Sequence, residues 1–92
     1  MEVATLRGIH QLLDLPIEDV EIAQLAQQAE IHYPGVQCGI MDQMAANLGD
    51  AKHILFLDTR RLERQLVPFP PGAEIVVIDS CVPRTLASSG YN

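Results

Sequence analysis

The chain has 92 residues and a net charge of −6 at pH 7, from 12 acidic and 6 basic side chains. This length fits a single domain. The hydrophobic fraction of 48% is typical of a folded globular chain and not of a disordered one. A negative charge of this size repels phosphate groups, which argues against nucleic acid or an anionic membrane surface as a partner. No apolar stretch approaches the roughly 18 residues that a membrane-spanning helix needs.

Cysteine and histidine are too scattered to indicate a zinc site. Cys38 and Cys81 form no CxxC pair, and the three histidines do not cluster. The first residues also lack a basic region followed by an apolar run, which is the mark of a secretory leader. We therefore expect reduced thiols and a cytoplasmic location.

Three helices are predicted in the first half of the chain. Residues 3–13 carry apolar side chains at three- and four-residue spacing, and Pro16 ends that helix because it disfavours helical backbone in the residue before it. Pro16 is also expected to open a second helix that extends to about His32. A short third helix is predicted over residues 40–48, with Gly49 as its C′ residue.

The second half of the chain is rich in strand-forming residues. Residues 53–58 form a short aliphatic run that predicts a buried strand, and residues 63–68 predict a weaker edge strand that ends in proline. Residues 74–79, Glu-Ile-Val-Val-Ile-Asp, give the clearest strand signal of the chain. The predicted fold class is α+β, with about three helices followed by about three mostly antiparallel strands.

The candidate chemistry gathers around residues 38–43, Cys-Gly-Ile-Met-Asp-Gln. Gly39 frees the backbone, and Asp42 then falls in the first turn of the third helix, where the helix dipole favours a carboxylate. A carboxylate held there suits either a substrate hydroxyl or a helix cap, and the spacing alone favours the cap.

The same stretch resembles the central signature of the galactokinases, which belong to the GHMP family of small-molecule kinases. Gly-Ile-Met-Asp-Gln at 39–43 is preceded by Gly-Val at 35–36, as in that family. Residues 53–60 and 66–68 resemble its next strands, and residues 88–92 resemble a later sugar-contacting corner. The resemblance implies phosphorylation of the anomeric hydroxyl of galactose or a related sugar, with ATP as co-substrate and Mg²⁺ as cofactor.

Four residues acquire site roles from this resemblance. Asp42 matches the catalytic aspartate, which accepts the proton of the reacting sugar hydroxyl or orients that hydroxyl. Gly39 matches a backbone contact to the sugar, and Tyr91 matches a tyrosine that lines the sugar pocket. Glu30 matches an acid that helps to hold Mg²⁺. Without the resemblance, the simplest interpretations are a turn glycine for Gly39, a solvated helix residue for Glu30 and a terminal residue for Tyr91.

Other parts of a family kinase are missing from these 92 residues. The family's Gly/Ser-rich phosphate-binding loop belongs immediately before residue 1, and its first sugar motif, its third motif and the C-terminal domain have no counterpart here. We therefore expect residues 1–92 to be one partial domain, an internal segment that is inactive alone.

Three alternatives to an inactive galactokinase segment stay open. One is a kinase for a related sugar, because Pro-Arg-Thr at 83–85 departs from the commonest family pattern. Another is a non-catalytic module that binds a sugar or a partner protein. The third is a chain that self-associates through exposed sheet edges.

Overall fold

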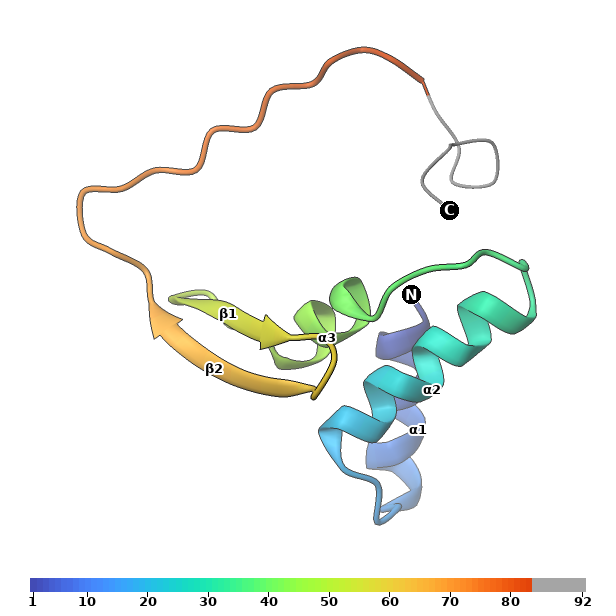
Figure 1. Cartoon of the computed structure of the whole chain (residues 1–92). Coiled ribbons are helices and arrows are strands. Elements are labelled where there is room, and N and C mark those ends of the chain that lie inside the picture. Colours follow the sequence, from blue (N-terminus) through green and yellow to red (C-terminus); the bar gives the residue numbers. More distant parts are fainter. Residues whose placement is uncertain (84–92) are drawn as a thin grey trace.

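The structure is a computed structural model, and it describes residues 1–83. The elements, in chain order, are helices α1 (Glu2–Leu13), α2 (Asp19–His32) and α3 (Met41–Leu48) and strands β1 (His53–Asp58) and β2 (Glu63–Pro68). The two strands pair as an antiparallel ladder in which His53 lies opposite Pro68 (Figure 1). The predicted α+β class, with helices before strands, is confirmed.

The helix boundaries follow from local chemistry. α1 ends at Asp14, whose φ of 47° is left-handed, a conformation that aspartate tolerates better than most residues. α2 begins at Asp19 and not at the predicted Pro16. Its start is fixed by Glu18, whose backbone N–H donates a hydrogen bond to Oε2 of Glu21 at 3.0 Å. This interaction satisfies a backbone donor that the first turn would otherwise leave unpaired, and it delays the helix by three residues relative to the prediction.

The core lies where α3 packs between α2 and β1. Ala23, Ile40 and Met44 form its centre, and Ala23 and Met44 are completely buried. The partly buried hydrophobic residues around this centre are Val20, Leu48, Leu55, Leu57 and Leu62. Because α3 is in contact with both neighbouring elements, its position is set on two sides by apolar packing.

A polar contact joins all three helices. Asn47 of α3 is only 7% exposed, and its Nδ2 donates a hydrogen bond to the backbone oxygen of Asp19 at the start of α2. Arg7 of α1 donates from Nη1 to Oδ1 of Asn47 at 2.8 Å and to its backbone oxygen at 3.1 Å. One buried amide therefore ties the last turn of α3 to both other helices.

Gly49 ends α3, but not in the left-handed conformation that is common for a glycine after a helix. Its φ and ψ are −69° and 153°, and its N–H donates to the backbone oxygen of Ala45 at 2.9 Å. A Cβ atom at this position would lie 2.6 Å from that same oxygen. The glycine is therefore required by a close backbone approach and not by a positive φ.

The third predicted strand, residues 74–79, is wrong for this structure. Residues 69–83 contain no strand, and the segment leads away from β2 after a turn at Gly72 (Figure 1). Its four apolar side chains, Ile75, Val76, Val77 and Ile78, are 76–88% exposed. A strand exists only when a neighbour accepts and donates its backbone hydrogen bonds. Within residues 1–83, no strand pairs with this segment.

Candidate functional site

Asp42 lies in the first turn of α3, as predicted, where it is the second helical residue, and it is exposed. Ile40 is the N-cap residue, and no side chain of the described structure caps this end of the helix. The capping role that spacing alone favours for Asp42 is therefore not found. The carboxylate lies instead in the first turn of α3, at the positive end of the helix dipole.

Asp42 lines a hollow of about 240 Å³ where three helices meet. Glu30 reaches this hollow from the last turn of α2, and Glu2 reaches it from the first turn of α1. The remaining lining residues are Met1, Val3, Cys38, Gln43 and Ala46. The tertiary structure thus places Glu30 and Asp42, which are twelve positions apart in the sequence, in the lining of one hollow.

Glu2 was not recognised as a site residue from the sequence. A hydrogen bond from the backbone holds the pKa of its carboxyl below the ordinary value. Its only sequence signal is an acidic residue in the first turn of a predicted helix, and such residues are common for the helix dipole alone.

Gln43 is a second residue whose place in the site was missed. It is 8% exposed, and its Oε1 has no hydrogen-bond partner in the described part of the chain. A buried amide oxygen without a partner costs free energy, so such a group often marks a functional position. Its adjacency to Asp42 is a weak signal, because consecutive helix residues point in different directions.

A second hollow, of about 400 Å³, adjoins Asp42 on its β1 side. Its walls are largely apolar and come from Met41, Ala45, Leu55, Leu57 and Thr59. Asp42 lines both hollows, so its carboxylate is bordered by polar groups on one side and by aliphatic side chains on the other.

Gly39 lies in the loop before α3, and its surroundings are open. Its φ is not positive, unlike that of Gly35 in the same loop, which is 73°. A Cβ atom built at Gly39 would meet no atom within 4 Å. Neither backbone conformation nor packing within residues 1–83 therefore requires a glycine here, although close approach of a ligand to the backbone would.

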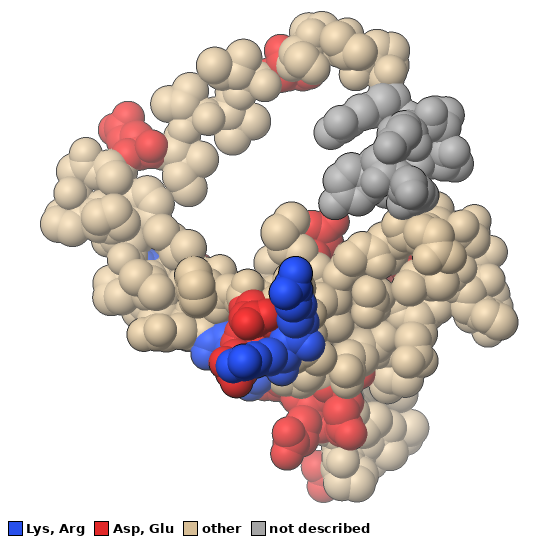
Figure 2. Space-filling view, in the orientation of Figure 1, with Lys and Arg blue, Asp and Glu red and all other residues tan. Residues whose placement is uncertain are grey.

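The remaining charged groups lie elsewhere. Figure 2 shows basic side chains gathered near the turn between β1 and β2, where Arg60 and Arg61 lie in the turn and Arg64 is the second residue of β2. No lysine or arginine of the described residues lines the hollow that holds Glu30 and Asp42. The groups that would neutralise a bound phosphate are therefore missing from this hollow as far as residue 83.

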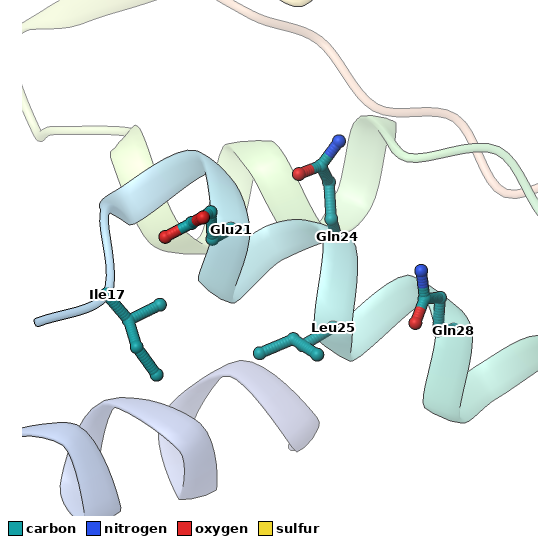
Figure 3. A pocket seen from close by; sticks show the side chains of 5 residues that line it. All are labelled: Ile17, Glu21, Gln24, Leu25 and Gln28. Carbon is teal, nitrogen blue, oxygen red and sulfur yellow. The ribbon is translucent and has the colours of Figure 1, made fainter. Parts of the chain in front are cut away.

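A third groove, of about 290 Å³, is formed by Ile17 and one face of α2, and it shares no lining residue with the hollows around Asp42 (Figure 3). Ile17 and Leu25 point toward α1, and Gln24 and Gln28 project from the same side of α2. Its single carboxylate, that of Glu21, is already engaged at the start of α2. The groove therefore offers no pair of acidic groups for chemistry.

Residues 1–83 contain no group of three or more His, Cys, Asp or Glu side chains that could hold a metal ion. Magnesium needs only one or two protein carboxylates when substrate phosphates supply other oxygen ligands, and Glu30 fits that requirement.

Tyr91, the fourth predicted site residue, lies outside the described residues. None of the helices described is long and apolar enough to cross a bilayer.

Comparison with known proteins gives two matches. The GHMP kinases N terminal domain family matches residues 1–50, which contain all three helices and the hollow around Asp42. The galactokinase of Roseiflexus sp. (strain RS-1) is 49% identical over 92 residues, which is 100% of this chain and 24% of that protein. The chain therefore spans about a quarter of the length of this relative.

Proposed function

Because the chain belongs to the GHMP kinase family, we propose that it is part of an ATP-dependent sugar kinase. The proposed reaction transfers the γ-phosphoryl group of ATP to the anomeric hydroxyl of galactose or a close relative. The similarity to a galactokinase supports this sugar. The observation that carries the proposal is the hollow at the start of α3 that Glu30 and Asp42 both line.

Asp42 is the proposed catalytic residue. Its exposed carboxylate accepts the proton of the attacking sugar hydroxyl, or orients that hydroxyl while the phosphoryl group transfers. Packing of α3 on α2 and β1 holds this residue in place at the start of the helix.

The sugar is proposed to lie beside Asp42, between Gly39 and the aliphatic walls contributed by β1. A pyranose has apolar C–H faces and polar hydroxyl edges, which matches a site with Leu55 and Leu57 on one side and a carboxylate on the other. The open space at Gly39 lets a hydroxyl approach the backbone closely.

Glu30 is the proposed protein ligand of Mg²⁺, with the phosphates of ATP supplying further oxygen ligands. When bound, the ion neutralises charge on the phosphates during transfer. Residues 1–83 contribute no cationic side chain to this hollow, so we propose that the 92-residue chain alone does not turn over.

A hybrid kinase tests this function. In it, residues 1–92 replace the matching segment of the Roseiflexus sp. galactokinase, and ADP formation is measured with galactose and ATP. Asp42→Asn is expected to lower kcat by about 10²–10⁴-fold, the usual contribution of general acid–base catalysis. Asp14→Asn is the matched control, since it makes the same change at an exposed, left-handed helix end that asparagine tolerates. Normal turnover by Asp42→Asn would overturn the proposal.

A non-catalytic sugar-binding module is the second candidate. It is favoured by one observation, that two of the three proposed sugar contacts, Gly39 and Asp42, lie within residues 1–83, whereas no lysine or arginine of these residues lines the hollow. Titration of the 92-residue chain with galactose in the absence of nucleotide distinguishes the two. Micromolar binding together with an inactive hybrid kinase would favour the module.

A further inference from the structure

Gln27 forms the hydrogen bond that ties the loop before α3 to α2. Its Nε2 donates to the backbone oxygen of Cys38 at 3.1 Å, and the contact is partly buried. Outside helices and strands, residues 34–39 take part in no backbone–backbone hydrogen bond within the described structure. The Gln27 amide therefore anchors a loop that backbone hydrogen bonds leave unsupported.

The acceptor of this bond belongs to the peptide unit that also contains the N–H of Gly39. A trans peptide is planar, and its carbonyl and N–H point in opposite directions. The described residues contain no cis peptide bond. By holding the carbonyl of Cys38 toward α2, Gln27 therefore directs the N–H of Gly39 away from α2, to the exposed side of the loop.

We infer that Gln27 is a positioning residue, whose side-chain amide orients the Cys38–Gly39 peptide so that the Gly39 N–H is presented as a hydrogen-bond donor to a sugar oxygen. This inference rests on the proposed sugar kinase function. The missing Cβ at Gly39 leaves room for the sugar, and the Gln27 bond fixes the direction of the donor. Asp42, three residues later, then meets the sugar from the first turn of α3.

The kinetic test uses Gln27→Leu and Gln27→Glu in the hybrid kinase. Both variants keep approximately the size of glutamine, and both lose the N–H donor. We expect the KM for galactose to rise about tenfold, the effect of one misplaced hydrogen bond, while the KM for ATP changes less than twofold. A role limited to general stability would instead reduce the amount of folded enzyme, which lowers the apparent kcat and leaves both KM values unchanged.

Gln28→Leu is the matched control, because it makes the same change at the next residue of α2. Gln28 lines the groove along α2 (Figure 3), and the hydrogen bond to the backbone oxygen of Cys38 comes from Gln27. We expect its KM for galactose to stay at the value of the unsubstituted hybrid. Equal galactose KM values for Gln27→Leu and Gln28→Leu would overturn the inference.

A second measurement is independent of kinase activity. In ¹H–¹⁵N spectra of the 92-residue chain, the Gly39 amide reports the hydrogen bond to the carbonyl of Cys38. Gln27→Leu is expected to move the Gly39 cross-peak while the Thr5 cross-peak in α1 stays in place, and Gln28→Leu is expected to leave both unchanged. A Gly39 cross-peak that does not move in Gln27→Leu would overturn the positioning role of Gln27. An inactive unsubstituted hybrid combined with a shifted Gly39 cross-peak would overturn the kinase function and not the orientation of the peptide.

Discussion

The helical half of the chain and the segment 74–79 use apolar side chains of similar size in opposite ways. Ile22 and Met44 are 2% and 0% exposed, whereas Val77 and Ile78 are 88% and 86% exposed. A helix satisfies its backbone hydrogen bonds internally and needs a neighbour only to cover one apolar face. A strand also needs a neighbouring strand for its backbone hydrogen bonds. Helical apolar side chains such as Ile22 and Met44 are therefore buried, whereas those of residues 74–79 stay exposed because no described strand pairs with them.

Truncation of Met44 is the most severe test of this comparison. Met44→Ala removes a fully buried side chain from the contact between α2, α3 and β1 and is expected to lower the free energy of unfolding by about 2–5 kcal/mol. Val77→Ala is the control and is expected to change it by less than about 0.5 kcal/mol. Urea unfolding followed by circular dichroism measures both values. Similar losses in the two variants would show that residues 74–79 are packed in solution.

The buried amide of Asn47 should give the next largest effect. Asn47→Leu removes the hydrogen bonds of the Asn47 side chain to the backbone oxygen of Asp19 and to Nη1 of Arg7. We expect the free energy of unfolding to fall by about 1–3 kcal/mol in the same measurement. Gln28→Leu, at an exposed position of α2, is expected to change stability by less than about 0.5 kcal/mol. An Asn47→Leu protein as stable as the unsubstituted chain would contradict the role of this residue in joining the helices.

Self-association is the expected outcome for the 92-residue chain at high concentration, since residues 75–78 offer an exposed apolar strand sequence. Val77→Lys is expected to restore a monomer in sedimentation velocity runs at increasing concentration, with little effect on stability. Leu12→Lys is the control, because Leu12 is 82% exposed but helical. An unsubstituted chain that stays monomeric at every concentration tested would contradict the expected self-association.

A small pH dependence is expected from Asp50. A hydrogen bond with the His53 ring, at 2.8 Å, holds the pKa of this carboxyl below its ordinary value of 3.8, and the backbone N–H of Lys52 adds to the effect. A lowered pKa in the folded state stabilises the protein above the ordinary value, and this stabilisation is lost as the pH falls through the lowered pKa. Asp50→Asn should therefore flatten the decline in urea midpoint below about pH 4, whereas Glu74→Gln should not. Parallel curves for Asp50→Asn and the unsubstituted chain would contradict this expectation.

Prediction from the sequence succeeded where local rules decide the structure. The end of α1, the extent of α3 to within one residue and both observed strands follow from periodicity, proline and glycine. The prediction was wrong where a single side-chain contact or the absence of a neighbouring strand determined the secondary structure. The hydrogen bond between Glu18 and Glu21 moved the start of α2 to Asp19, and the third strand is unpaired within residues 1–83.

For the candidate site, the order of residues specifies where Asp42 lies along its helix, whereas helix packing specifies which distant residues lie near it. Asp42 at the start of a helix follows from the order of residues, because a helix start is a local feature. Its placement beside Glu30, Glu2 and a buried Gln43 depends on how α1, α2 and α3 pack. No local pattern specifies the Asn47 and Gln27 contacts that join those helices and loops, because their partners are 11 to 40 positions away in the sequence.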